Sequence, residues 1–232
     1  MNNYIKHLLL CCFLLAGIYT DAQNSHISFT VSMPAPETHY FHVELSYSGN
    51  TKTVLNFTMP AWMPGYYQLM DYAKNVEHFS VKSLEGKVMK WQQSSQNVWI
   101  VDCGAVKNFS VSYDVKADRK FVANSYLDSE RAYISPAGIF LYTEENMQQP
   151  VTVVIKPFAA WKNIATGLEP VHGKKNTYTA NNFDILYDCP VLAGNLEELP
   201  SFSINKIPHR FVGYKLGLTA TLTRAADGRA RI

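Results

Sequence analysis

The sequence carries almost no net charge and has no basic tract. Its 232 residues include 21 lysines and arginines against 19 aspartates and glutamates, which gives a formal net charge of +2. Proteins that bind nucleic acid or anionic membranes present clustered positive charge, so we expect neither as a partner. The hydrophobic share of 47% is ordinary for a folded protein, and the length suffices for one large domain or two small ones.

Long apolar runs are also missing. The longest extends from Leu8 to Ile18, which is well short of the roughly 20 residues that a membrane-spanning helix needs. Lys6 precedes this run, and small residues lead up to Ala22 in the pattern that signal peptidase reads. The sequence therefore predicts a signal peptide over residues 1–22, export to the periplasm or the extracellular space, and no membrane association after cleavage.

Cysteine is scarce. Of the four cysteines, Cys11 and Cys12 lie in the predicted signal peptide, and Leu10 in place of a small residue before Cys11 disfavours lipid anchoring. The mature chain holds Cys103 and Cys189. These either form one disulfide, as an oxidising compartment allows, or serve separately as small buried apolar residues, and the sequence leaves both alternatives open. No C-x-x-C or H-x-x-x-H companion is present, so we expect no zinc site at these cysteines.

Catalytic motifs are absent. The sequence has no H-E-x-x-H, no G-x-S-x-G, no phosphate-binding P-loop and no G-x-G-x-x-G. His39 and His42 stand three apart in a predicted strand, where odd spacing sends side chains to opposite faces, so they are not expected to share a metal. The acidic pairs Glu144-Glu145 and Glu197-Glu198 are typical of solvated turns. We therefore expect no catalytic residue, no metal site and no cofactor in this chain.

The dominant pattern that is present is alternation of apolar and polar residues with period two, which is typical of half-buried strands. Short strands at this spacing, without long helical patterns, predict an all-β fold in which antiparallel sheets pack face to face as a β-sandwich. Glycine-containing turns at Ser48–Asn50 and Glu85–Gly86 suit tight hairpins. The expected strands are His26–Met33, Tyr40–Tyr47, Val54–Met59, Phe79–Lys82, Val98–Val101, Phe109–Val115, Arg131–Ile134, Val151–Ile155, Tyr178–Phe183 and Phe211–Leu216.

Helix is expected in one or two short turns. Asp71 is placed to cap a turn that runs to Val76, and Phe158, Trp161 and Ile164 have the spacing of a second turn that ends near Gly167. The sandwich is expected to span residues 23–217. Residues 218–232 differ in composition, since arginine replaces lysine and large apolar residues are rare, and we expect this divergent tail to be disordered.

Three segments in order resemble a known family. The first joins a W-x-P-G-x-Y motif to the aromatic residues that follow it, the second is similar to W-x-x-A-T-G-L, and the third to D-x-L-x-D-x-P-x-x-x-G. A histidine, His209, stands where one commonly opens the next strand. The segments are Trp62–Tyr67 with Asp71–Ala73 and Val76–Phe79, then Trp161–Leu168, then Phe183–Gly194. In these residues the chain resembles the amino-terminal domain of the glycyl aminopeptidase family, metallopeptidase family sixty-one, over nearly all of the mature sequence up to about Gly217.

This resemblance implies a β-sandwich that precedes a thermolysin-like zinc domain and a small PDZ-like domain, neither of which this sequence contains. Zinc is implied for the intact family member alone. We expect a truncated, exported, non-catalytic member that packs against a protease domain, in cis or in trans, and shapes the approach to its cleft.

The aromatic residues near the first motif have two interpretations. Trp62 and Tyr67 pack in the core as a rigid corner between sheets, with Pro64 fixing φ, or they belong to a surface that binds the protease domain or a peptide substrate. The candidate binding residues are Trp62, Tyr66, Tyr67 and Met70.

The alternative function is a free-standing secreted β-sandwich that binds peptide or carbohydrate. Its flat aromatic faces would come from Trp62, Trp91, Trp99 and Trp161, because indole rings suit sugar rings. Trp99 lies within an alternating strand and is expected in the core.

Overall fold

The computed structural model describes residues 25–63 and 65–216. The predicted signal peptide, Pro64 and the predicted tail over 218–232 lie outside the described residues, so the expectations about them stay predictions.

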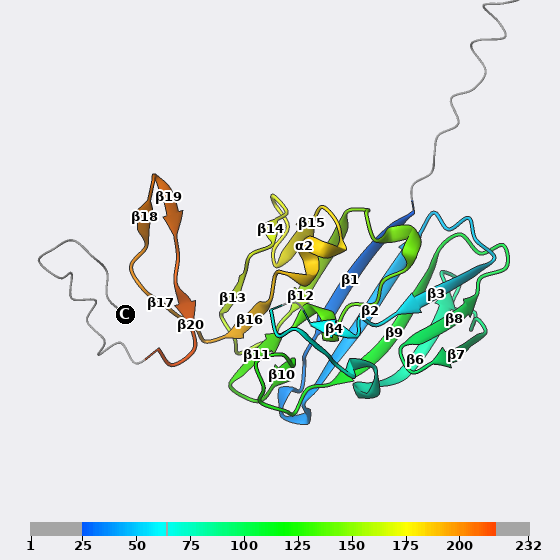
Figure 1. The fold of residues 1–232 in the computed structure, drawn as a ribbon, viewed down its shortest axis with the longest axis horizontal. Coiled ribbons are helices and arrows are strands. Elements are labelled where there is room, and N and C mark those ends of the chain that lie inside the picture. The colour runs from blue at the N-terminus through cyan, green and yellow to red at the C-terminus, as the bar shows by residue number, and fades with distance from the viewer. Residues whose placement is uncertain (1–24, 64, 217–232) are drawn as a thin grey trace, which may run out of the picture.

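One large sheet forms the body of the molecule (Figure 1). Its seven strands are ordered β14-β15-β12-β1-β2-β9-β6. Among the described residues, all neighbours in this sheet pair antiparallel except β1 and β12, which are parallel. The strands are β1 (His26–Ser32), β2 (Tyr40–Ser48), β6 (Val76–Ser83), β9 (Phe109–Lys116), β12 (Val151–Lys156), β14 (Glu169–Pro170) and β15 (Thr177–Ala180).

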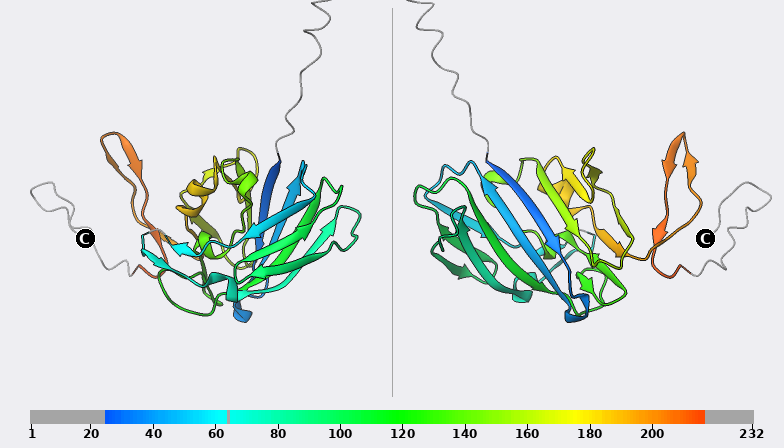
Figure 2. Two further views of the ribbon diagram at one scale, coloured as in Figure 1. Left: turned by 45° about the vertical axis from the view of Figure 1, so that its right-hand side comes forward. Right: turned by 180° about the vertical axis from the view of Figure 1, so that it is seen from behind.

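The alternation in the sequence decides which face of this sheet is buried. In β9, Phe109, Val111 and Tyr113 are buried while the intervening residues are half-buried. The same pattern holds in β1, β2 and β12. Because successive side chains point to opposite faces, one face of the sheet is apolar and the other is lined with serine, threonine and charged residues. Seen from behind, β1, β2 and β9 lie in front with this outer face toward the viewer (Figure 2).

Two smaller sheets complete the core. One has the order β3-β8-β7 and the other β10-β11-β16-β13. Buried residues of all three sheets belong to a single hydrophobic cluster, so the predicted all-β sandwich is confirmed. The bounds are β3 (Val54–Thr58), β7 (Trp91–Ser95), β8 (Val98–Asp102), β10 (Tyr126–Leu127), β11 (Arg131–Ile134), β13 (Asn163–Thr166) and β16 (Val191–Gly194).

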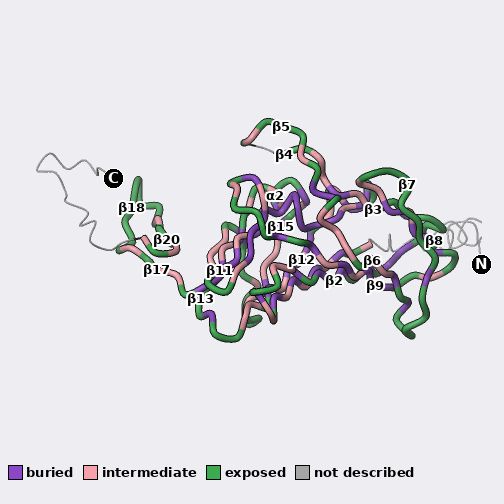
Figure 3. The backbone as a smooth tube through the Cα atoms, turned by 90° about the horizontal axis from the view of Figure 1, so that it is seen from below, coloured by how far each residue is buried: buried purple, intermediate pink, exposed green. Residues whose placement is uncertain are grey.

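Three two-stranded pairs complete the strand inventory. They are β4 (Trp62–Met63) with β5 (Gln68–Leu69), β17 (Glu197–Glu198) with β20 (Val212–Gly213), and β18 (Phe202–Ile204) with β19 (Ile207–His209). The β4–β5 and β18–β19 hairpins both stand out from the body (Figure 3).

Over residues 25–63 and 65–216, the helical elements are all short. They are η1 (Pro36–Thr38), η2 (Tyr72–Asn75), η3 (Pro136–Gly138), η4 (Glu144–Asn146) and α2 (Phe183–Tyr187). The turn expected after Asp71 forms as η2, but the Asp71 side chain makes no capping hydrogen bond with it. Among the described residues, no helix is long and apolar enough to cross a membrane.

Two helix and strand expectations are wrong around the second and third motifs. The helix expected from Phe158 to Gly167 is absent, because Asn163–Thr166 forms β13 and pairs with β16. The strand expected from Tyr178 to Phe183 ends at Ala180. Asn182 starts α2 there, since its side-chain oxygen accepts a hydrogen bond from the Ile185 amide at 2.9 Å.

The turn at Ser48–Asn50 does not form the expected hairpin. β2 and β3, which it connects, lie in different sheets. The Asn50 side chain donates to the carbonyl oxygens of Lys52 and Val106 at 2.8 and 2.9 Å, and this fixes the crossing. The turn at Glu85–Gly86 is as expected, with Gly86 at φ +81° and a bridge between Lys82 and Val88. Of the strand expected from Phe211 to Leu216, β20 alone forms.

A buried hydrogen bond of Tyr113 gives a test of this core. The Tyr113 hydroxyl donates to the Ile139 carbonyl at 2.7 Å, and burial raises the pKa of this phenol. Tyr113→Phe leaves the carbonyl without its donor and is expected to lower the free energy of unfolding by about 1–3 kcal/mol. Chemical denaturation measures the change. The half-buried Tyr178→Phe is the control, and an equal loss in both variants would contradict this role of Tyr113.

Candidate functional site

The candidate binding residues lie on the β4–β5 hairpin. Trp62 is paired with Leu69, and Met63 with Gln68. At the base of the hairpin, the Met70 amide donates to the Ala61 carbonyl at 2.6 Å. Gly65 lies at φ +79° in open space, a left-handed conformation that glycine adopts without steric cost.

Three large side chains of this hairpin are exposed. Trp62 is 48% exposed, Tyr67 is 76% exposed, and Leu69 is 78% exposed. The Trp62 and Tyr67 rings meet edge to face with centroids 6.5 Å apart. The interpretation that Trp62 and Tyr67 fill the core is therefore wrong, because the hairpin carries them away from the sandwich. Leu69 was not anticipated, although an isolated leucine beside Gln68 in a punctuated segment is a weak sign of a surface contact.

Other residues of the β4–β5 hairpin are anchored to the sandwich. Tyr66 packs edge to face on Phe121, with centroids 5.1 Å apart. Met63 and Met70 pack against the core cluster. The structure thus brings the four predicted residues together on one hairpin, where Trp62 and Tyr67 are exposed while Tyr66 and Met70 pack against neighbouring residues.

Tyr72 fixes the chain as it leaves the hairpin. Its hydroxyl donates to the Ala123 carbonyl at 2.6 Å, and its ring is buried. A Cβ at Gly138 would lie 2.9 Å from Cδ1 of this ring, so only glycine fits at the contact between η2 and η3. The hairpin is consequently held by a packed support and not by a free loop.

A partly enclosed cavity of about 260 Å³ lies beside the hairpin base. Met70 lines it together with charged groups of η2 and of the segment after β9. Lys116 contacts Asp118 at 3.3 Å, and Lys74 lies 4.0 Å from Asp71. The hydrogen bond to Asp118 raises the pKa of Lys116. These charged side chains are paired and exposed. The cavity therefore has a polar wall next to the β4–β5 hairpin.

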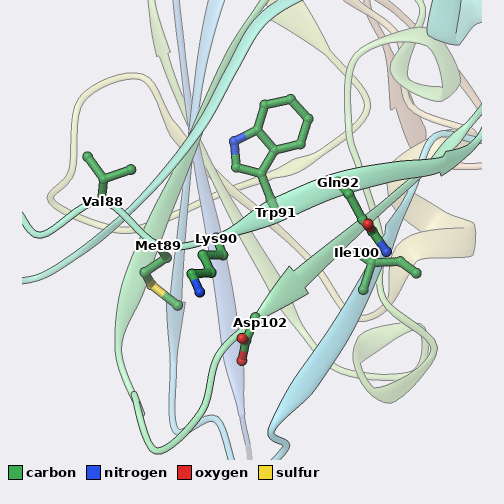
Figure 4. Close-up of a pocket in the computed structure, with 7 residues that line it drawn as sticks. All are labelled: Val88, Met89, Lys90, Trp91, Gln92, Ile100 and Asp102. Atoms are coloured by element: carbon green, nitrogen blue, oxygen red, sulfur yellow. The ribbon is translucent and has the colours of Figure 1, made fainter.

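A second, open hollow of about 620 Å³ lies on the β3-β8-β7 sheet (Figure 4). Trp91 is 40% exposed there, and its ring packs edge to face on Phe79 at 4.8 Å. Trp99 and Trp161 are buried. The core position expected for Trp99 is confirmed, and a binding surface that uses all four tryptophans is wrong. The residues that line the hollow are Val88, Met89, Lys90, Trp91, Gln92, Ile100 and Asp102.

Histidines on the outer face of the large sheet make carboxylate contacts. Nδ1 of His42 and of His78 each donate to Asp114, at 2.7 and 2.8 Å. His39 precedes β2 at φ +62°, which corrects its assignment to a strand, and its ring contacts the Leu127 carbonyl. Within the described ranges, no group of three or more His, Cys, Asp or Glu side chains is arranged to hold a metal ion. The residues described here therefore do not fit the zinc that the family resemblance implies.

Cys103 and Cys189 are free thiols in the structure, so of the two alternatives for this pair the disulfide is not formed. Burial raises the pKa of the Cys103 thiol to about 11 and also raises the pKa of Cys189. A thiolate is the nucleophilic form of cysteine, so neither residue has the character of a catalytic nucleophile.

Comparison with known families decides the assignment. The sequence profile of the Peptidase M61 N-terminal domain matches residues 28–195. The chain belongs to this family. A comparison of this M61 N-terminal domain with curated proteins gives no match.

One solved structure agrees with the family. An aminopeptidase N family protein from Idiomarina loihiensis is 25% identical, with a TM-score of 0.73 over 80% of this chain. The M61 N-terminal domain spans 32% of the length of that protein. Two further solved structures are each 14% identical to this chain. One is a variant of a two-domain M1 zinc metallopeptidase bound to L-tryptophan, with a TM-score of 0.45 over 85% of this chain and 49% of that protein. The other is an M1 zinc metallopeptidase from Deinococcus radiodurans, with a TM-score of 0.43 over 88% of this chain and 50% of that protein.

The raised pKa of Cys103 makes its reactivity dependent on pH. Because the folded-state pKa of about 11 lies above the ordinary value of 9.0, the thiolate fraction is small near neutral pH. We expect alkylation of Cys103 in the native chain to be slow at pH 8 and to accelerate as pH rises toward 11. Mass spectrometry of iodoacetamide-treated protein measures this, with guanidinium-unfolded chain as the control. Equal native and unfolded rates at pH 8 would contradict the burial.

Proposed function

We propose that this M61 N-terminal domain is the exported, non-catalytic domain of a zinc metallopeptidase, which packs its β4–β5 hairpin against the peptidase domain and thereby shapes the approach to the cleft. The observation that carries the proposal is the exposure of Trp62, Tyr67 and Leu69 on a hairpin that Tyr66 and Met70 anchor to the sandwich. The family match supports the identity of the partner.

The exposed side chains of the β4–β5 hairpin suit a protein interface. Trp62, Tyr67 and Leu69 expose large apolar surface on one short hairpin. Aromatic residues are enriched where interfaces are tightest. An exposed group of this kind on a soluble domain marks a contact site, and the peptidase domain is the partner that an amino-terminal domain of this family accompanies.

The anchoring of the β4–β5 hairpin supports a role in docking to another domain. Tyr66 on Phe121 and Tyr72 against Gly138 hold the hairpin in place. A surface that is ordered before binding loses less conformational entropy when the partner arrives. The polar cavity beside Met70 lies next to this surface and would border the path to the cleft.

Hydrolysis is assigned to the peptidase domain. The described residues offer no ligand set for zinc, and the two thiols are poor nucleophiles at neutral pH. Zinc belongs to the intact metallopeptidase that the family resemblance implies, where it would supply Lewis-acid chemistry. The residues of this chain position the partner domain.

Export is part of the proposal and rests on sequence. The apolar run from Leu8 to Ile18 after Lys6, with small residues before Gln23, supports a cleaved signal peptide and a periplasmic or extracellular protein. In that compartment, association with the peptidase domain is in cis along one chain or in trans between two.

A chimera tests the docking surface. In the Idiomarina loihiensis protein, the matched third is replaced by residues 25–216 of this chain, and Trp62→Ser with Tyr67→Ser is introduced. In the chain by itself, this double variant is expected to change the free energy of unfolding by less than about 0.5 kcal/mol, because both side chains are exposed. In the chimera, the loss is expected to reach about 2 kcal/mol. Denaturation followed by circular dichroism measures both.

Leu84→Ser is the matched control, because Leu84 is 72% exposed on a different turn. It is expected to have no effect in either protein. If the double variant behaves like this control in the chimera, the β4–β5 hairpin is not the docking surface.

A further inference from the structure

The β18–β19 hairpin is well specified by its own sequence. Asn205 and Lys206 form the turn at φ +50° and +66°, the left-handed pair that a tight hairpin turn requires. At the base, the Arg210 guanidinium binds Glu198 with two hydrogen bonds of 2.7 and 2.8 Å. The hairpin is therefore a regular strand pair with a defined turn and an ion pair at its base.

The two faces of this hairpin differ. Phe202 pairs with His209, and Ile204 pairs with Ile207. Residues paired across two strands share a face of the sheet, and so do residues two positions apart in one strand. One face therefore carries Phe202, Ile204 and Ile207 together with His209, whose ring stacks on Phe202, and the other carries Ser203 and Pro208. This is the pattern of a strand pair with one face in a hydrophobic core.

That core is missing from the sandwich. Phe202, Ile204 and Ile207 are 50%, 54% and 61% exposed. None of them belongs to the hydrophobic cluster of the described residues, nor to the side chains packed against it. Within residues 25–63 and 65–216, β18 and β19 pair only with each other, so each has an unpaired edge. A lone two-stranded hairpin is marginally stable in water.

The position of the hairpin identifies what covers it. The family match ends at residue 195, before β17 begins at Glu197. This N-terminal domain spans 32% of the Idiomarina loihiensis protein, so most of that protein lies outside the aligned segment. The hairpin follows the matched segment and stands clear of the body of the sandwich (Figure 1), so its apolar face is open to a domain that adjoins this end of the sandwich.

We infer that β18–β19 is an incomplete sheet layer whose apolar face is covered by the peptidase domain, so that residues 197–216 belong to that domain's fold. This rests on the proposed function for the identity of the partner, but it uses a different surface. It would place the end of the sandwich near residue 195 and not at the 217 expected from the sequence. The Lys215–Glu130 ion pair of 2.8 Å then links the two units.

The chain itself provides the first test. Hydrogen exchange by mass spectrometry is expected to show that amides of residues 199–211 exchange at least about tenfold faster than those of β1, β2 and β9. Phe202→Ser with Ile207→Ser is expected to leave the melting temperature unchanged, as Leu84→Ser does. Equal protection, or a melting temperature lowered by this double variant alone, would show that the hairpin belongs to the sandwich and would overturn the inference.

The chimera and the oligomeric state test the identity of the partner. In the chimera, exchange over residues 199–211 is expected to slow by about tenfold, and Phe202→Ser with Ile207→Ser is expected to restore fast exchange. Unchanged exchange in the chimera overturns the inference. So does a dimer of the chain, measured by sedimentation, that this double variant dissociates, because a second copy would then be the partner. If Trp62→Ser with Tyr67→Ser still destabilises the chimera, the proposed function survives that failure.

Discussion

The buried face of the seven-stranded sheet is the constraint on which the rest of the structure depends. Its apolar residues are covered by two smaller sheets that share one core with it. Burial of this surface is the main favourable term in folding, and Tyr113 enters it only because its hydroxyl finds the Ile139 carbonyl. The large apolar side chains Trp62, Tyr67, Phe202 and Ile207 of the hairpins stay outside this core.

The two projecting hairpins follow from that closure. The β4–β5 hairpin exposes Trp62 and Tyr67, and one face of the β18–β19 hairpin exposes Phe202 and Ile207. Apolar side chains that a finished core leaves in solvent are available for another protein surface. Both hairpins support the proposal that exposed apolar side chains of this M61 N-terminal domain pack against a peptidase domain.

Much of the fold could be predicted from the sequence, because alternation within one strand is a local signal. It located β1, β2, β9 and β12 and the buried side of each. Pairing between distant segments is not local, so the crossing after β2 resembled a hairpin turn. The stretch before Gly167 resembled a helix because its apolar spacing fits one, yet its pairing with β16 decided for a strand. For the candidate site, the motif identified residues that the structure places together on one hairpin. The exposure of Trp62 depends on the direction in which the two-residue strand β4 leaves the sandwich, which the sequence composition does not encode.

The most direct measurement is an aminopeptidase assay on the purified chain with glycyl and alanyl peptide substrates, with zinc added and with zinc chelated. If the chain is the non-catalytic domain of a metallopeptidase, no amino-terminal residue is released under either condition, while the intact Idiomarina loihiensis protein serves as the comparison under the same conditions. Zinc-dependent release by the purified chain, abolished by the chelator, would contradict the central claim.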